Sequence, residues 1–388
     1  MNINIIKDIN PWWDKDNWED YDKNLKLLKE AKYIYEPKWI NDISLEPFSL
    51  NFIIGPRQVG KTTGLKLFIK KLIEKGYDKN KIIYLDCEIF PNFKYLQDYI
   101  LYFLKEDKEK IFILDEVSSL NYWWKAVKFL IDSGKLDYSI LIVTGSSSLK
   151  VRKDIELFPG RIGKGKEIEV LPLNFKEYVD IHNVKDDEEI IKLFDKYLKT
   201  GGFLSVLNGL PSIDILKGFI NEFIRFNKSE EIIKEIVASL INKIPSALSY
   251  RTIAKDTSGY SYKIVQKYLE FLKDLYIVDF AYLKEGNKIL YRKEKKIFFR
   301  DPLLLNLFSE WSNTKYLESA LYENVVQEHL YRKFKEIYYY KNSYEIDCIA
   351  DNLKIEVKTG KPYRNYPKDV IILDKEDIPK FLINLFKD

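Results

Sequence analysis

The sequence predicts an α/β protein in which a parallel sheet with helices on both faces is followed by helices and then by a smaller α+β region. Three observations support this prediction. Four short apolar runs, separated by helical sequence, lie between residues 50 and 144. A glycine-bearing turn at 55–62 joins the first run to a helix, and beyond residue 300 short alternating runs replace the apolar ones. Short, wholly apolar runs are typical of strands buried on both faces, as in a parallel sheet.

The composition is that of a folded globular protein. Of 388 residues, 46% are hydrophobic and 31% are charged, and 63 basic against 59 acidic residues give a net charge of +4. This balance excludes a uniformly basic coat but not a local basic patch. Two cysteines are too few for a disulfide framework or a four-cysteine zinc site, and two histidines are too few for a histidine-rich metal cluster. With neither a signal sequence nor an apolar run of about 20 residues, we expect a cytoplasmic protein without a membrane partner.

The expected elements follow the chain in this order. A helical stretch at 21–31 precedes strands at 50–54, 81–86, 111–114 and 140–144, with a helix at 62–75 after the first strand. Helices at 213–243 end near Pro245. A short helix at 250–255, a longer one at 261–275 and a hairpin at 277–283 and 289–292 come next, an order typical of a winged helix. The last region has a helix at 320–335, strands at 336–340, 345–350, 354–358 and 370–373, and a closing helix at 378–386.

The turn after the first strand carries the P-loop, or Walker A, pattern G-x-x-x-x-G-K-[ST]. Its residues are Gly55, Pro56, Arg57, Gln58, Val59, Gly60, Lys61 and Thr62, and Thr63 follows them. Glycines allow main-chain N–H groups to point inward, where they and the helix N-terminus hold phosphate oxygens. Lys61 is expected at the β- and γ-phosphates of ATP, and the Thr62 hydroxyl on Mg²⁺. The alternative is a glycine turn that merely caps a helix.

The third strand ends in Asp115-Glu116, the Walker B position. We expect Asp115 to hold the metal and Glu116 to orient or deprotonate the attacking water. A solvated strand end is the alternative. After the fourth strand, Ser146 or Ser147 is a candidate sensor of the γ-phosphate, with a serine helix cap as the rival interpretation.

Arg161 lies in the turn 158–161 and is a candidate to stabilise transition-state charge. It would act either within its own chain or across a subunit boundary, which leaves a homo-oligomer open. The alternative is an ordinary surface arginine.

Several segments together resemble a known family. GPRQVGKTT, IFILDEVSSL, VTGSSSL, FPGRIGKGKEIEVLPLNFKEY and TGGFLSVL occur in this order, and KIFFRDPLLLNLF, ALYENVVQEHL and YYYKNSYEIDCIADNLKIEVKTGK follow. The chain resembles the AAA-type ATPases of archaea and bacteria that carry a C-terminal restriction-endonuclease-like domain. The resemblance implies ATP binding, Mg²⁺-dependent hydrolysis and work on nucleic acid. The expected parts are an N-terminal arm at 1–47, a P-loop ATPase domain at 48–200, a helical lid at 201–245, a winged helix at 246–300 and an endonuclease-like domain at 301–388.

The last region contains a second candidate site. Asp347 and, nine residues on, Glu356-Val357-Lys358 resemble the D…E-x-K core of restriction-type nucleases, and Glu323 matches its extra acidic position. Two such carboxylates can share a metal ion beside a lysine that polarises water. Three interpretations stay open: an active nuclease, a nuclease-like fold used for binding or assembly, and an unrelated structure. The short connection at 359–369 counts against cleavage.

The hairpin region 284–300 is a candidate DNA-binding surface. It holds seven Lys or Arg and two Glu, a net +5. Phosphate contacts are the simplest use of such a patch, and a contact between domains is the rival.

The lead function is therefore Mg²⁺-dependent ATP hydrolysis coupled to DNA binding or remodelling. One alternative is a nucleotide-dependent switch whose non-catalytic C-terminal part binds a protein. The other is an ATP-gated, metal-dependent nuclease.

Overall fold

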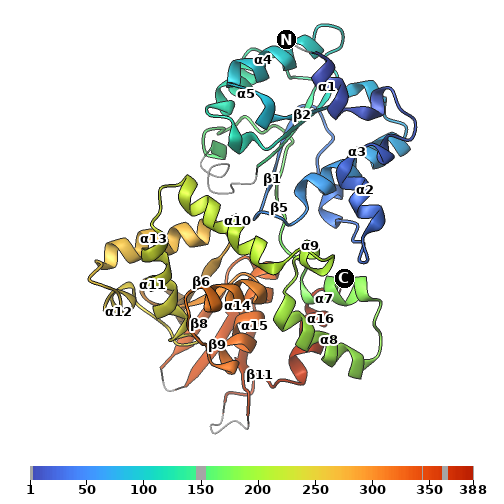
Figure 1. Cartoon of the computed structure of the whole chain (residues 1–388). Helices are drawn as coiled ribbons and strands as arrows, with labels where there is room; N and C mark the ends of the chain where they lie inside the picture. The colour runs from blue at the N-terminus through green and yellow to red at the C-terminus, as the bar shows by residue number, and fades with distance from the viewer. Residues whose placement is uncertain (1–2, 146–153, 343, 361–365, 388) are drawn as a thin grey trace. The chain divides into compact units, whose positions relative to one another are not determined.

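The structure, a computed structural model, describes residues 3–145, 154–342, 344–360 and 366–387. The chain divides into two compact units, Met1–Leu171 and Pro172–Asp388 (Figure 1). Among the described residues, no helix combines the length and the apolar character needed to cross a membrane.

The first unit is built on a five-stranded parallel sheet. Its order is β2-β3-β4-β1-β5, with β1 at Ser49–Ile54, β2 at Ile82–Asp86, β3 at Ile111–Asp115, β4 at Ile140–Thr144 and β5 at Glu167–Glu169. The four strands expected from the apolar runs are confirmed to within about a residue at each end. The fifth has only three residues, which explains why no run marked it.

Helices cover both faces of this sheet. They are α1 (Ile3–Ile9), α2 (Lys23–Glu30), α3 (Lys61–Glu74), α4 (Phe93–Phe103) and α5 (Trp123–Asp132), with short 3-10 turns at Pro11–Trp13, Trp18–Asp20, Lys38–Asn41, Lys79–Lys81, Cys87–Ile89 and Val117–Ser119. Strand side chains alternate between the two faces. Phe52 and Phe112 share a core with residues of α4 and α5, whereas Ile53 and Ile113 share one with residues of α3. Figure 1 shows α4 and α5 on one side of the sheet and α3 on the other.

The N-terminal arm covers the exposed edge of β2. The Asn10 side chain forms a pair of hydrogen bonds with the main chain of Tyr84, donating to its carbonyl at 2.8 Å and accepting from its N–H at 2.7 Å. The indoles of Trp12 and Trp13 both donate to the carbonyl of Ile82. The unpaired main-chain groups of an edge strand can pair with a strand of another chain, so the arm protects β2 against such aggregation.

The second unit contains a six-stranded mixed sheet of order β11-β10-β9-β8-β6-β7. The strands are β6 (Val278–Glu285), β7 (Lys288–Phe299), β8 (Tyr338–Lys341), β9 (Glu345–Ala350), β10 (Leu353–Val357) and β11 (Ile371–Leu373). Its helices are α7 (Phe175–His182), α8 (Asp187–Thr200), α9 (Leu204–Leu207), α10 (Ser212–Arg225), α11 (Glu230–Ile241), α12 (Tyr250–Ala254), α13 (Tyr262–Asp274), α14 (Pro302–Trp311), α15 (Glu318–Phe334) and α16 (Asp377–Leu385).

Two sequence-based boundaries need correction in this unit. Residues 172–200, assigned above to the ATPase domain, lie in the second unit. The reason is aromatic packing: Phe175 and Tyr197, from α7 and α8, share a core with Tyr322 of α15. The second hairpin strand continues to Phe299 instead of ending at 292, and β6 pairs in parallel with β8. The hairpin and the endonuclease-like region therefore share one sheet, while the finer division into lid, winged helix and endonuclease-like domain stays a prediction.

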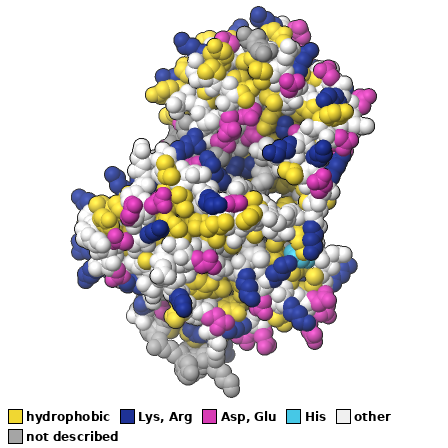
Figure 2. All heavy atoms as spheres, viewed as in Figure 1, with side chains coloured by type: hydrophobic (Ala, Val, Ile, Leu, Met, Phe, Trp, Pro, Cys, Tyr) yellow, Lys and Arg dark blue, Asp and Glu magenta, His cyan; other side chains and the backbone are white. Residues whose placement is uncertain are grey.

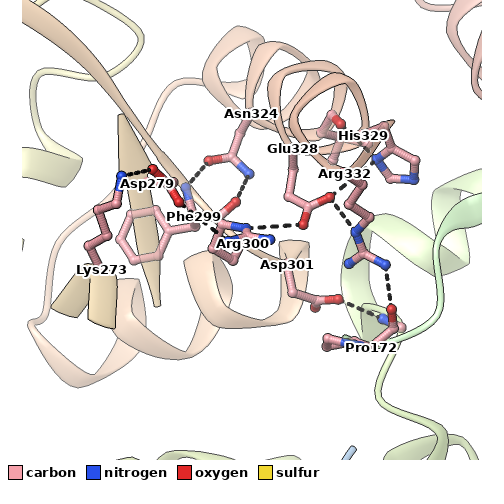
Figure 3. Close-up of polar contacts among 12 residues, drawn as sticks. Pro172, Lys273, Asp279, Phe299, Arg300, Asp301, Asn324, Glu328, His329 and Arg332 are labelled. Carbon is pink, nitrogen blue, oxygen red and sulfur yellow. Dashed lines mark hydrogen bonds and ion pairs between the residues drawn. The ribbon is translucent and has the colours of Figure 1, made fainter. Parts of the chain in front are cut away.

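A buried polar network ties the start of this unit to α15 (Figure 3). Glu328 accepts hydrogen bonds from Arg300 at 3.3 Å and from Arg332 at 2.6 Å, and Arg332 also donates to the carbonyl of Pro172. Asp301 accepts from the Gly202 N–H at 2.9 Å. Each of these charged side chains is almost fully buried and has lost its hydrating water. The hydrogen bonds and ion pairs within the network offset the free-energy cost of that lost hydration.

Candidate functional site

The turn between β1 and α3 has the geometry that its glycines predict. Gly60, the residue before α3, has φ +90°, and Gln58 also has a positive φ of 61°. Gly55 is required for a different reason, because a Cβ there would lie 1.9 Å from the Val170 carbonyl oxygen. The loop therefore packs against the chain just after β5 and opens at the N-terminus of α3, where main-chain N–H groups are free of helical partners.

Lys61 is held within this loop. Its side chain is largely buried, and Nζ donates hydrogen bonds to the carbonyls of Gly55 at 2.8 Å and Pro56 at 2.6 Å. The ammonium group thus lies at the phosphate cradle that the sequence predicted, within the turn that would surround the phosphates.

Strand alternation brings three more polar residues to the same place. Tyr84, Asp115 and Thr144 come from β2, β3 and β4, and the apolar residues two positions before each of them pack on the α3 face. Thr62 stands on the first turn of α3 and hydrogen-bonds Asp115. The predicted metal-binding pair, Thr62 and Asp115, is therefore brought together at the carboxyl edge of the parallel strands, where open α/β sheets bind their ligands.

The Asp115 carboxylate is buried and has several donors. Burial raises its pKa, and the hydrogen bonds from Tyr84 and Thr62 oppose that rise. The Tyr84 hydroxyl donates to Oδ2 at 2.6 Å, and the Glu116 N–H donates to Oδ1 at 3.0 Å. A carboxylate that is dehydrated in this way gains from a nearby cation.

Lys66 lies behind this pair, one helical turn after Thr62. Its Nζ is 3.4 Å from the centroid of the Tyr84 ring and 3.4 Å from Oδ2 of Asp22 in the arm. Burial lowers the pKa of Lys66, and Asp22 opposes that shift. Neither Tyr84 nor Lys66 was expected from the sequence, because the lysine lies outside the loop pattern and the tyrosine resembles one more apolar strand residue.

The donor set suits magnesium. Mg²⁺ prefers hard oxygen ligands and commonly keeps several waters, with one or two protein oxygens and substrate phosphates completing its shell. The Thr62 hydroxyl and the Asp115 carboxylate are two such oxygens, already within hydrogen-bonding reach of one another.

Glu116 follows Asp115 in a left-handed conformation with φ 54°. Its carboxylate accepts a hydrogen bond from the Ser118 hydroxyl, and its carbonyl accepts one from Ser119 at 2.7 Å. The side chain therefore lies at the carboxyl edge of the sheet but is turned toward the following 3-10 turn.

Two predicted residues, Ser146 and Ser147, lie outside the described residues. Thr144, which sequence reasoning missed, is buried at the end of β4 between β3 and β1, and its hydroxyl finds no hydrogen-bond partner in the described parts of the chain. The sequence did contain a signal for Thr144, because it is the one polar residue at the end of an otherwise apolar strand.

Arg161 lies near the amino-terminal end of β1, whereas the P-loop follows the carboxyl-terminal end of that strand. It pairs with Asp132 at the end of α5, with Nε 2.7 Å from Oδ1, and the next residue, Ile162, accepts a hydrogen bond from Leu50 at the start of β1. Because the P-loop follows the other end of β1, Arg161 does not reach the nucleotide site of its own chain. Only the action across a subunit boundary stays a prediction.

The C-terminal candidate residues converge as well. Asp347 of β9 accepts from the Val357 N–H at 2.9 Å, and the Asp347 N–H donates to Glu356 at 3.2 Å. Lys358 donates to Glu356. Glu323 of α15 joins them through Lys296 of β7. Sequence reasoning counted Lys296 only among the basic residues of the hairpin region and missed this role, because its partners are 27 and 51 residues away.

The surface of the hairpin region 284–300 carries less positive charge than its sequence suggests. Lys295, Lys296 and Arg300 are buried, with 5%, 2% and 3% exposure. Removing these three from seven leaves four basic residues against two glutamates, a net +2 in place of +5. On the face drawn in Figure 2, Lys and Arg side chains are interspersed with Asp and Glu.

Known proteins resemble this chain in part. Residues 48–179 match the family described as AAA domain. An uncharacterized protein of Methanocaldococcus jannaschii is 28% identical over 66% of this chain, which spans only 60% of that protein. An uncharacterized protein of Haemophilus influenzae is 26% identical over 86% of this chain and 88% of its own length.

Solved structures align more loosely. The Aeropyrum pernix ORC2 protein in its ADP form has a TM-score of 0.40 and 14% identity, covering 75% of this chain and 92% of its own. CDC6p from Pyrobaculum aerophilum has a TM-score of 0.33 and 14% identity, covering 77% and 94%. The family match covers the sheet, the loop and the carboxylate described above, so residues 48–179 are similar to AAA-type P-loop ATPases.

Proposed function

We propose that this chain binds Mg²⁺ and ATP at the P-loop, hydrolyses ATP, and couples hydrolysis to a change in how its second unit engages DNA. The observation that supports the proposal most directly is the convergence of Lys61, Thr62 and Asp115 at the carboxyl edge of one parallel sheet.

Each residue has a role that follows from its chemistry. Lys61 would turn from the loop carbonyls to the β- and γ-phosphates, and main-chain N–H groups of the loop would hold the remaining phosphate oxygens. Thr62 and Asp115 would hold Mg²⁺, which supplies charge neutralisation at the phosphates when bound. Glu116 would leave Ser118 to orient the attacking water. Ser146 or Ser147 would sense the γ-phosphate, and Arg161 would act from a neighbouring copy.

DNA is the partner that the second unit's exposed charges favour. Lys288, Arg292 and Lys293 are exposed on the hairpin, and Lys263 and Lys267 lie one turn apart on the exposed side of α13. The order α12, α13, β6, β7 is that of a winged helix, whose second helix and hairpin contact the duplex. Contacts to phosphates from these five side chains would give a salt-dependent, sequence-tolerant affinity.

The test compares ATP hydrolysis by the parent and by Lys61→Ala, with Lys75→Ala at the exposed far end of α3 as the control. We expect Lys61→Ala to lose roughly 100-fold or more of the rate, because it removes a charge aimed at the transferred phosphate. A rate equal to that of the parent would refute the site. Repeating the assay over a panel of nucleic acids and over protein concentration tests the DNA coupling and the action of Arg161 between copies.

A second candidate function is a nucleotide-dependent switch that holds ATP and turns it over slowly. The observation favouring it is the hydrogen bond from Ser118 to Glu116, which directs the water-activating carboxylate toward its own turn. The switch predicts slow hydrolysis that does not respond to DNA. Stimulation by DNA would exclude it.

A further inference from the structure

We propose that the Lys296 ammonium group is the resident cation of the nuclease-like carboxylate cluster, so that this site takes no divalent metal and the second unit binds without cleaving. The cluster consists of Glu323, Glu345, Asp347 and Glu356. This inference does not depend on the proposed ATPase function, because it concerns residues of the second unit alone.

The position of Lys296 supports the proposal first. Its Nζ lies 2.6 Å from Oδ1 of Asp347, 2.8 Å from Oε1 of Glu323 and 3.1 Å from Oε1 of Glu345. An ammonium group has three N–H donors, and three carboxylates stand ready to accept them. The lysine side chain is 2% exposed, so it is enclosed by the cluster and does not reach it from solvent.

The remaining oxygens of Asp347 and Glu356 already have protein donors. Oδ2 of Asp347 accepts from the Val357 N–H at 2.9 Å, and Oε2 of Glu356 accepts from the Asp347 N–H at 3.2 Å. Oε1 of Glu356 accepts from the Tyr366 hydroxyl at 2.8 Å and from Lys358. The two carboxylates that would share a metal in a D…E-x-K site are therefore directed toward protein N–H, O–H and ammonium groups.

Charge and size explain why a metal does not fit beside this lysine. A Mg²⁺ ion needs oxygens at about 2.0–2.1 Å in octahedral geometry. The oxygens of Asp347 and Glu323 are instead arranged around an ammonium nitrogen, and a metal between them would place two cations in direct contact. Burial opposes the charge on Lys296, but Glu323 and Asp347 outweigh it and raise its pKa well above the usual value. The lysine therefore stays charged.

The strand pattern explains how Lys296 comes to this place. Lys296 pairs with Ala281 across the β6–β7 ladder, and it shares a strand face with Phe298. Both Ala281 and Phe298 pack in the core formed with α15, the helix that carries Glu323. Lys295 points to the other face, where its Nζ is 4.1 Å from the centroid of the Tyr250 ring. Two adjacent buried lysines thus have different environments, which provides a matched control.

The first experiment uses the parent protein. Manganese binding is followed by electron paramagnetic resonance without nucleotide, with Asp115→Asn to silence the P-loop site and Asp347→Asn to silence the cluster. We expect no Mn²⁺ binding that depends on Asp347 at millimolar metal, and no cleavage of single- or double-stranded DNA that depends on Asp347. Either kind of dependence would overturn the proposal.

The second experiment removes the resident cation. In Lys296→Ala the cluster is left with unpaired carboxylates and a space, so we expect a new Mn²⁺ site and metal-dependent stabilisation. With the metal at about a hundred times its Kd, the melting temperature should rise by roughly 5 °C or more. Lys295→Ala should show no such rise, and Lys296→Ala with Asp347→Asn should lose it. A folded Lys296→Ala protein that gains no metal response would overturn the proposal, and if that variant does not fold, the parent measurement decides.

Discussion

Single side chains at the nucleotide site act in a chain of contacts that begins outside the P-loop. Asp22 in the arm lies against Lys66, the Lys66 ammonium lies over the Tyr84 ring, and the Tyr84 hydroxyl donates to Asp115. A hydrogen bond to a charged group contributes about 1.5–3 kcal/mol. Tyr84 would therefore be a positioning residue, because its hydroxyl acts on the carboxylate that we propose as a metal ligand.

Replacing Tyr84 with Phe removes this hydroxyl and keeps the ring. We expect the pKa of Asp115 to rise further, because one of the hydrogen bonds that oppose the effect of burial is lost. Half-maximal hydrolysis should need roughly tenfold more Mg²⁺, and the acidic limb of the rate against pH should move to higher pH. Titration of Mg²⁺ at fixed ATP measures the first effect. The same Mg²⁺ dependence in Tyr84→Phe and in the exposed control Tyr95→Phe would contradict the assignment.

His329 predicts a pH dependence in the second unit. It is buried, and its Nε2 accepts the Phe175 N–H at 2.9 Å, which requires the neutral ring. Burial lowers its pKa to about 4. The unfolded chain takes up this proton near pH 6.5, so the free energy of unfolding should fall by about 3 kcal/mol as the pH drops from 6.5 to 4.

Burial also raises the pKa of Asp301, to about 7, which acts in the opposite sense over the same pH range. The measurement therefore compares the parent with His329→Gln, since Asp301 contributes equally to both. The parent should lose stability relative to the variant on acidification, as followed by urea unfolding at a series of pH values. A difference that does not change with pH would show that His329 keeps an ordinary pKa.

The sequence predicted the residues of the site where a local pattern defines them. Lys61, Thr62 and Asp115 each stand at a strand or helix end that apolar runs mark, so their convergence could be foreseen. Lys296 and Tyr84 could not, because their partners are remote in the chain and they occupy positions that only the folded sheet brings together. Arg161 was placed by a turn pattern that does not reveal its partner, Asp132.

Among the elements, the N-terminal arm has the clearest structural purpose. β2 is an edge strand, and the arm supplies side chains where a sixth strand would supply main chain. Asn10 imitates a peptide group there, since one amide both donates to and accepts from Tyr84. A strand of only five residues, shielded in this way, presents little open edge.

Replacing Asn10 with Ala leaves a buried N–H and a buried carbonyl of β2 without partners. We expect the first unit to lose about 1–3 kcal/mol of stability and the protein to aggregate more readily on warming. Asn17→Ala is the matched control, because the Asn17 side chain makes no capping hydrogen bond. Urea unfolding and light scattering measure the two effects. Equal behaviour of the two variants would mean that the arm merely lies on the sheet.

The elements show which sequence signals are reliable. Runs such as residues 140–143 are apolar throughout and are buried throughout, so length and composition located them. β7 was underestimated because its charged stretch resembles a solvated turn, although Lys295 and Lys296 are buried. The boundary at 171 was missed because the sequence does not show which core α7 and α8 join, and only their aromatic packing assigns them to the second unit.

At the scale of the whole molecule, two compact units carry different chemistry on one chain. The first holds the candidate nucleotide site, and the second holds the exposed basic residues of α13 and the hairpin together with the Lys296 cluster. The second unit is stabilised at its beginning by the network of Figure 3, in which Glu328 is shared by Arg300 and Arg332. Separate cores predict that the two units can unfold separately.

Calorimetry should therefore resolve two unfolding transitions, one shifted by substitutions in the second unit and the other by nucleotide binding to the first. Glu328→Gln leaves the buried Arg332 guanidinium without its carboxylate and leaves Arg300 with Asp279 alone, which costs about 3–5 kcal/mol and should lower the transition of the second unit by roughly 10 °C. Glu318→Gln on the same helix is the control, because its ion pair with Lys375 is exposed. A nonhydrolysable ATP analogue with Mg²⁺ should raise only the other transition, and Lys61→Ala should abolish that rise. If the analogue and Glu328→Gln shifted the same transition, the two units would unfold as a single cooperative body. ATP binding would then be coupled to the stability of the second unit already in the folded protein before hydrolysis.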